Sequence, residues 1–249
     1  MASDFEKRVE SEEELWNIIS DFNNNKNSAS LIKAAEYLIN NINTEALAKK
    51  LSTDELTNEG KRDLAFALSL SGHDEVESYI IDSLASLSNL GQKGDTTLDL
   101  QKVRLMVALS TNGKVSEQGF QALASLAKDS TESPNVRNNA LINLGSSLRQ
   151  LESNGLNSAG LEEQLSASLS LAMQEEEASS AILAAGNAHL TNLDDEIFAK
   201  LSSHNSKERY AAGSVLSRNP NYTDDMITHL RNEPSDLVSH AIISNLDKT

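Results

Sequence analysis

Residues 133–145 read SPNVRNNALINLG, and in this segment Arg137 precedes Ala140 by three positions. The same spacing returns in SKERYAAGSVL, residues 206–216, where Arg209 again stands three positions before an alanine. Apolar residues separated by three and four positions lie on one face of an α-helix. Two helices with the same register, far apart in the chain, indicate an internal repeat.

The repeat extends through most of the chain. The pattern and its looser versions, two of which lack the arginine, begin at residues 62, 104, 137, 178, 209 and 238, with steps of 42, 33, 41, 31 and 29 residues. Each step has the length of one helix pair, and pairs of this kind stack around a shared core. We expect the alanines where two helices approach closely. The arginine opposes the positive helix N-terminus, so we expect its acceptor in the next repeat or its loop.

Composition favours helices throughout, because Leu, Ala, Ser, Glu and Asn dominate and aromatic residues make up only 4%. The apolar spacing predicts helices over residues 4–24, 28–40, 44–51, 58–70, 74–90, 98–111, 116–128, 133–151, 158–173, 177–189, 194–202, 206–217, 223–231 and 235–246. We therefore predict an all-α fold, a right-handed α-α superhelix or solenoid of about six to seven helix pairs. Residues 1–57 are predicted to form an irregular N-terminal cap, continuous with the repeats of residues 58–249.

The repeat stretches resemble a known class of helical repeats. Residues 133–145 and 206–216 resemble the second helix of a repeat in the HEAT-like and armadillo-like family. AAGNA, residues 184–188, is similar to a segment in the helical domain of vitellogenin-type lipid carriers. The resemblance implies that the second helix of each pair lines a concave surface. The residues it places there are Arg104, Arg137, Asn138, Asn187 and Arg209, with Tyr210 as a further contact.

The chain is strongly acidic and contains no cysteine: 37 acidic and 21 basic residues give a net charge of −16. This charge repels a phosphate backbone and argues against nucleic-acid binding. Without cysteine, a disulfide scaffold, a thiolate zinc site and a cysteine nucleophile are excluded. The five histidines form neither His-x-His nor His-Glu-x-x-His, so we expect no metal or cofactor. The chain contains no run of eighteen apolar residues, so the sequence predicts no transmembrane segment.

The acidic residues are distributed unevenly. Residues 150–199 contain nine acids and neither lysine nor arginine. Such a stretch forms either a solvated surface or one that attracts a basic segment of a protein partner. The candidate partner-binding residues are Glu162, Glu163, Glu175, Glu176, Glu177, Asp194, Asp195 and Glu196, together with Arg137, Arg209 and Tyr210.

The sequence thus predicts a non-catalytic protein-binding or scaffold module that uses an extended solenoid surface. Two alternatives stay open: the helical domain of a larger, vitellogenin-like lipid carrier, and a HEAT-like enzyme or cofactor-handling subunit. The location also stays open. We expect the cytoplasm if the chain is complete, and a secreted or luminal location if a signal peptide has been removed.

Overall fold

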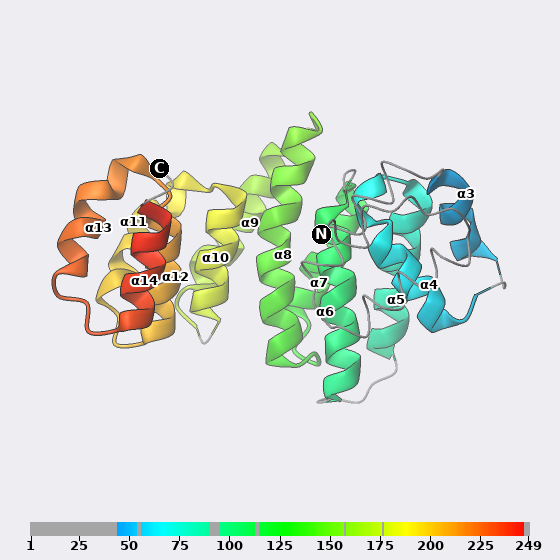
Figure 1. The fold of residues 1–249 in the computed structure, drawn as a ribbon, viewed down its shortest axis with the longest axis horizontal. Helices are drawn as coiled ribbons and strands as arrows, with labels where there is room; N and C mark the ends of the chain where they lie inside the picture. The colour runs from blue at the N-terminus through cyan, green and yellow to red at the C-terminus, as the bar shows by residue number, and fades with distance from the viewer. Residues whose placement is uncertain are drawn as a thin grey trace, which may run out of the picture. The chain divides into compact units, whose positions relative to one another are not determined.

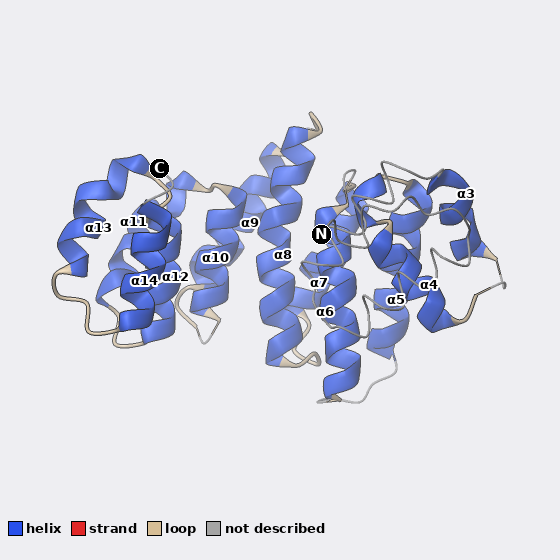
Figure 2. Cartoon of the chain, viewed as in Figure 1, coloured by secondary structure: helices blue, strands red, loops and turns tan. Residues whose placement is uncertain are grey.

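The computed structural model describes residues 44–53, 56–89, 95–112, 115–156, 158–175 and 177–246. Within these ranges the regular structure consists of α-helices and short 3-10 helices, with no strand (Figure 2). The all-α prediction is therefore confirmed for the described part of the chain. The helices predicted over residues 4–24 and 28–40 lie outside it.

The chain divides into two compact units. Unit 1 comprises residues 1–122 and 130–133, and unit 2 comprises residues 123–129 and 134–249. The division runs through helix α7 (Glu117–Lys128), whose first half belongs to unit 1 and whose second half belongs to unit 2. The cap boundary at residue 57 and the single continuous solenoid from residue 58 stay predictions.

Unit 1 is built from helices that bury leucine, isoleucine and methionine. Its described elements besides α7 are α3 (Thr44–Lys49), η2 (Lys50–Ser52), α4 (Asn58–Ala67), η3 (Ser69–Ser71), α5 (Asp74–Asn89) and α6 (Thr96–Thr111), as Figure 1 shows. Asp95 begins α6, since its side chain accepts hydrogen bonds from the backbone N–H groups of Thr97 and Leu98. The largest fully buried side chains are Leu64, Leu68, Ile80, Leu105, Met106 and Leu109.

A buried ion pair joins α6 of unit 1 to the short segment of residues 130–133. Lys102 Nζ lies 2.6 Å from Glu132 Oε2, and the two side chains are only 8% and 6% exposed. Glu132 also accepts a hydrogen bond of 2.7 Å from the Ser88 hydroxyl on α5. A buried charge requires such partners, because removal from water is costly. The carboxylate therefore anchors this segment to α5 and α6.

Unit 2 contains helices whose ends agree with the sequence pattern. They are α8 (Pro134–Ser153), α9 (Ala159–Ala172), α10 (Ala178–Ala188), η4 (Thr191–Leu193), α11 (Asp194–Ala199), η5 (Lys200–Ser202), α12 (Ser206–Leu216), η6 (Pro220–Tyr222), α13 (Thr223–Leu230) and α14 (Asp236–Leu246). The seven predicted ranges from 133–151 onward each contain one of the α-helices, with ends displaced by at most a few residues. Local signals explain this agreement: Pro134 begins α8 and the Asn205 side chain caps α12.

The even-numbered helices of unit 2 pack against one another in chain order. Helix α10 contacts both α8 and α12, and α12 contacts α14 (Figure 1). The backbones approach closely, because a Cβ added at Gly145 on α8 would overlap the Ala184 carbonyl on α10. The repeat alanines Ala140, Ala181 and Ala212 are fully buried. The structure thus buries the repeat alanines, and it places the closest approach of α8 and α10 at Gly145 and Ala184.

The odd-numbered helices α9, α11 and α13 form a second set of contacts in unit 2. The Ser170 hydroxyl of α9 donates to Glu196 of α11 at 2.8 Å. The rings of Phe198 and Tyr222 lie 5.9 Å apart, which joins α11 to η6 just before α13. Each of these helices also contacts the even-numbered helix that follows it. Unit 2 therefore has a core between two sets of helices.

None of the helices in the described ranges combines the length and the apolar character needed to cross a membrane.

Candidate functional site

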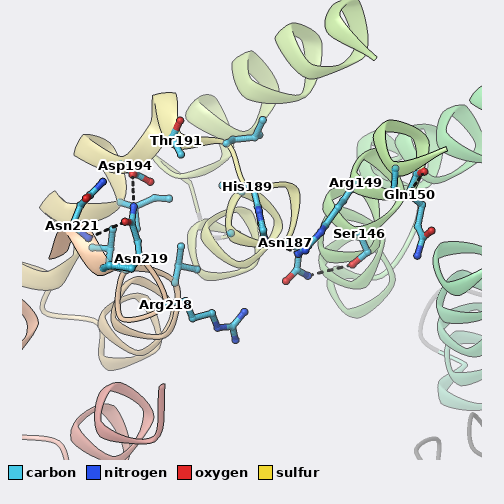
Figure 3. A pocket seen from close by; sticks show the side chains of 18 residues that line it. Ser146, Arg149, Gln150, Asn187, His189, Thr191, Asp194, Arg218, Asn219 and Asn221 are labelled. Carbon is cyan, nitrogen blue, oxygen red and sulfur yellow. Dashed lines mark hydrogen bonds between the residues drawn. The ribbon is translucent and has the colours of Figure 1, made fainter. Parts of the chain in front are cut away.

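A groove of about 680 Å³ lies in unit 2, at the ends of three successive even-numbered helices. Its residues come from the second half of α8, the end of α10, the η4–α11 segment and the end of α12 with η6, as Figure 3 shows. Most of the polar lining is Ser146, Arg149, Gln150, Ser153, Asn187, His189, Thr191, Asp194, Arg218, Asn219 and Asn221. Equivalent ends of neighbouring helix pairs thus create one shared surface.

Arg149 and His189 form the contact between α8 and α10 at this groove. Arg149 Nη1 lies 2.6 Å from His189 Nε2, and both residues are exposed. A guanidinium can only donate, so the imidazole Nε2 is the acceptor of this hydrogen bond. Below this pair, the Asn187 amide reaches Ser146 Oγ at 3.4 Å (Figure 3). Polar side chains therefore line the groove where α8 meets α10.

The backbone at His189 has an unusual conformation. Its φ of 57° is the one positive value at a non-glycine residue in the described ranges. The Leu190 N–H donates to the Ala185 carbonyl and the His189 N–H to the Gly186 carbonyl, which is the Schellman ending of α10. Glycine usually occupies this position, because the left-handed conformation costs another residue about 1–2 kcal/mol. The chain instead places an imidazole here, directed at the groove.

The opposite wall of the groove contains a carboxylate that is already engaged. Asp194 Oδ2 accepts a hydrogen bond of 3.3 Å from Asn219 Nδ2. Burial raises the pKa of Asp194 and outweighs the hydrogen bonds from Asn219 and Tyr222, which act in the opposite direction. Burial also raises the pKa of the Tyr222 phenol, and the nearby Asp194 carboxylate raises it further. This wall therefore presents amides and a partly buried acid.

Two of the repeat arginines, Arg137 and Arg209, are engaged in ion pairs. Arg137 Nη2 lies 2.7 Å from Glu177 Oε1, just before α10. Arg209 binds Glu233, in the loop before α14, through Nε and Nη2 at 3.0 and 2.9 Å. The prediction of an acceptor in the next repeat or its loop is confirmed for both. Their role in binding a partner stays a prediction.

The predicted acidic residues occupy different environments. Glu177 pairs with Arg137, Asp194 lines the groove, and Glu196 accepts from Ser170. Besides Glu196, the exposed members of the set are Glu162 and Glu163 at the start of α9, Glu175 after its end, and Asp195 on α11. Glu176 lies outside the described residues.

Tyr210 lies on α12 with 36% of its surface exposed. It follows Arg209, whose guanidinium also donates to the Ser203 carbonyl at 2.8 Å. Tyr210 does not line the groove. Asn187, which the family resemblance placed on the concave surface, does line it. Whether Tyr210 contacts a partner stays a prediction.

Sequence reasoning missed Arg149 and Arg218 as groove residues. Their common signal is position, because Arg149 stands near the end of α8 and Arg218 follows the end of α12. Both also lie outside the basic-free stretch of residues 150–199, in a chain with few basic residues. Recognising them as one site requires knowing that α8, α10 and α12 end around one groove.

No protein-family model matches this chain, and no curated protein is similar to it. In the described part of the chain, no three His, Asp or Glu side chains are grouped so that they could hold a metal ion.

Proposed function

We propose that this chain is a non-catalytic protein-binding module, built as a right-handed HEAT-like solenoid, and that the unit 2 groove is its binding surface. The solenoid arrangement is supported by the chain-order packing of α8, α10, α12 and α14. Solenoids of this kind bind partners across neighbouring repeats, because successive helices present equivalent positions to the same surface.

One observation carries the proposal: a groove of about 680 Å³ is lined by three successive repeats at their equivalent helix ends. Arg149, His189 and Arg218 each come from a different one of these repeats and are all exposed. Exposed polar side chains held by packed helices suit recognition of a partner, because the helices lose little conformational freedom on binding. The repeat arginines Arg137 and Arg209, by contrast, are used to hold neighbouring helices together.

Affinity capture with the purified full chain tests this function. Partners captured by the unchanged chain are identified, purified and measured again with Arg149→Glu and Arg218→Glu. We expect reversal of either groove charge to weaken binding of a true partner strongly. Lys207→Glu is the matched control, because Lys207 is an exposed cation of α12 outside the groove. A partner that binds all three variants as well as the unchanged chain would contradict the proposal.

A further inference from the structure

We propose that the groove binds an acidic segment of a partner protein, whose carboxylates are held by Arg149 and Arg218. This proposal rests on the protein-binding function above and names the chemistry of the partner.

The charge of the groove is opposite to that of the chain. Acidic residues outnumber basic ones by 37 to 21 overall, yet the groove lining contains two arginines against one aspartate. That aspartate, Asp194, accepts a hydrogen bond from Asn219 within the wall of the groove. A locally basic groove in an acidic molecule attracts a negatively charged ligand and repels a basic one.

Arg149 is positioned but not neutralised. Arg149 Nη1 contacts His189 Nε2 at 2.6 Å, and no carboxylate of the described residues forms an ion pair with the guanidinium. This contact uses one of five N–H donors and fixes the direction of the side chain. The remaining donors suit a carboxylate, which guanidinium groups bind through two parallel hydrogen bonds.

Arg218 follows the end of α12 and is exposed. Figure 3 shows it apart from the Arg149–His189 pair, on the α12 side of the groove. Its guanidinium makes no hydrogen bond or ion pair with the residues that the structure describes. Two arginines separated along one groove match two acidic side chains of an extended segment better than a single small anion.

Side-chain amides also line the groove. The Asn187 amide makes only long contacts, of 3.4 Å to Ser146 Oγ and 3.5 Å to the Ile142 carbonyl. Asn221 is exposed at the other wall. Amide side chains donate and accept, as the backbone of an extended peptide does. The groove therefore offers partners for both the side chains and the backbone of an acidic segment.

A purely structural role for the arginines makes a different prediction. Cations near helix C-termini stabilise helices by complementing the dipole; Arg149 lies just before the last turn of α8, and Arg218 follows the C-cap of α12. In that case, substitution of either arginine would lower the free energy of unfolding and leave the affinity for a ligand unchanged. Binding and stability must therefore be measured on the same variants.

The test uses fluorescein-labelled peptides of alternating glutamate and serine, with glutamine–serine and lysine–serine peptides as comparisons. Fluorescence anisotropy with the full chain at low salt gives the affinity. We expect the glutamate peptide to bind and the glutamine peptide not to bind, and any binding of the lysine peptide should be unaffected by the groove substitutions. Arg149→Gln and Arg218→Gln should each weaken binding about tenfold, the loss that corresponds to about 1.4 kcal/mol. Arg218→Lys should restore part of the affinity, and Arg231→Gln, an exposed arginine outside the groove, should leave it unchanged.

Several outcomes overturn the proposal. They are equal binding of the glutamate and glutamine peptides, unchanged affinity in both groove variants whether or not their melting temperature falls, and binding of a phosphoserine peptide in place of the glutamate peptide. Groove-dependent dimers in sedimentation, without peptide binding, would identify a second copy of the chain as the occupant.

If the captured partner needs the groove but the glutamate peptide does not bind, the acidic chemistry fails and the protein-binding function stands. If the partner ignores the groove, the function fails as well.

Discussion

Gly145 and Gly160 are both glycines within α-helices of unit 2, but their surroundings differ. A Cβ at Gly145 would overlap the backbone carbonyl of Ala184, whereas nothing lies within 4 Å of a Cβ at Gly160. Backbone cannot move aside as a flexible side chain can. The close contact between α8 and α10 therefore depends on the absence of a single methyl group, which explains a glycine in the middle of α8.

Alanine at these two positions should change stability in opposite directions. Replacement of a helical glycine by alanine is worth up to about 1 kcal/mol in helix propensity. Gly160→Ala should gain part of this amount. Gly145→Ala should instead lower the free energy of unfolding by about 1–3 kcal/mol, because α8 and α10 must separate. Urea unfolding measures both, and a stabilised Gly145→Ala variant would contradict the close helix contact.

His189 shows why single residues of the groove could not be predicted. The helix predicted over residues 177–189 places His189 at a helix end, and in the structure it is the C-cap of α10. Its left-handed φ of 57° and its contact with Arg149 depend on the packing of α10 against α8. Spacing along the chain contains no information on this contact, since the two residues are forty positions apart.

Among the helices, ion pairs join a basic residue on one even-numbered helix to an acid in the connection before a later one. Lys102 binds Glu132 in unit 1, while Arg137 binds Glu177 and Arg209 binds Glu233 in unit 2. Each acid lies in the connection that precedes an even-numbered helix. The repeat arginine and the helix ends could be predicted, because turn residues and apolar period are local properties. The acidic partners could not be assigned, since their separations vary with the length of the connection.

Glu233 provides a pH test of this linkage. Burial alone would raise the pKa of Glu233, but hydrogen bonds from Arg209, the Ser235 N–H and His229 together hold it below its ordinary value. A carboxyl with a lowered pKa stabilises the fold above the ordinary carboxyl pKa, and this stabilisation is lost as the pH falls through the lowered value. Glu233→Gln should therefore cost about 2 kcal/mol at neutral pH, the size of a charged hydrogen bond.

The free energies of unfolding of Glu233→Gln and of the unchanged chain should become equal as the pH falls through the lowered pKa, because protonated glutamate resembles glutamine. Urea unfolding at a series of pH values measures them. Glu163→Gln serves as the control, since Glu163 is exposed and should show no difference at any pH. A constant difference across the pH range would show that shape, and not charge, fixes the loop before α14.

At the scale of the whole molecule, the charge of −16 is arranged in two ways. Some acids hold helices together, and others lie exposed at helix starts, where they complement the dipole. Exposed pairs of this kind are Glu162 with Glu163 on α9 and Asp224 with Asp225 on α13. Composition could predict the excess of acids but not this division. Only the positions of neighbouring helices determine which acids keep their charge exposed.

The exposed acids of residues 150–199 still predict a surface for a basic partner segment, and charge reversal tests it. Glu162→Lys, Glu163→Lys and Asp195→Lys are combined in one chain, and Glu177 is left intact because it binds Arg137. Binding of a fluorescein-labelled oligolysine peptide should fall about tenfold, since three exposed pairs contribute roughly 0.5 kcal/mol each. Asp224→Lys with Asp225→Lys is the matched control at another helix start. An equal loss per charge in both chains would mean general attraction to an acidic molecule, without a surface of its own.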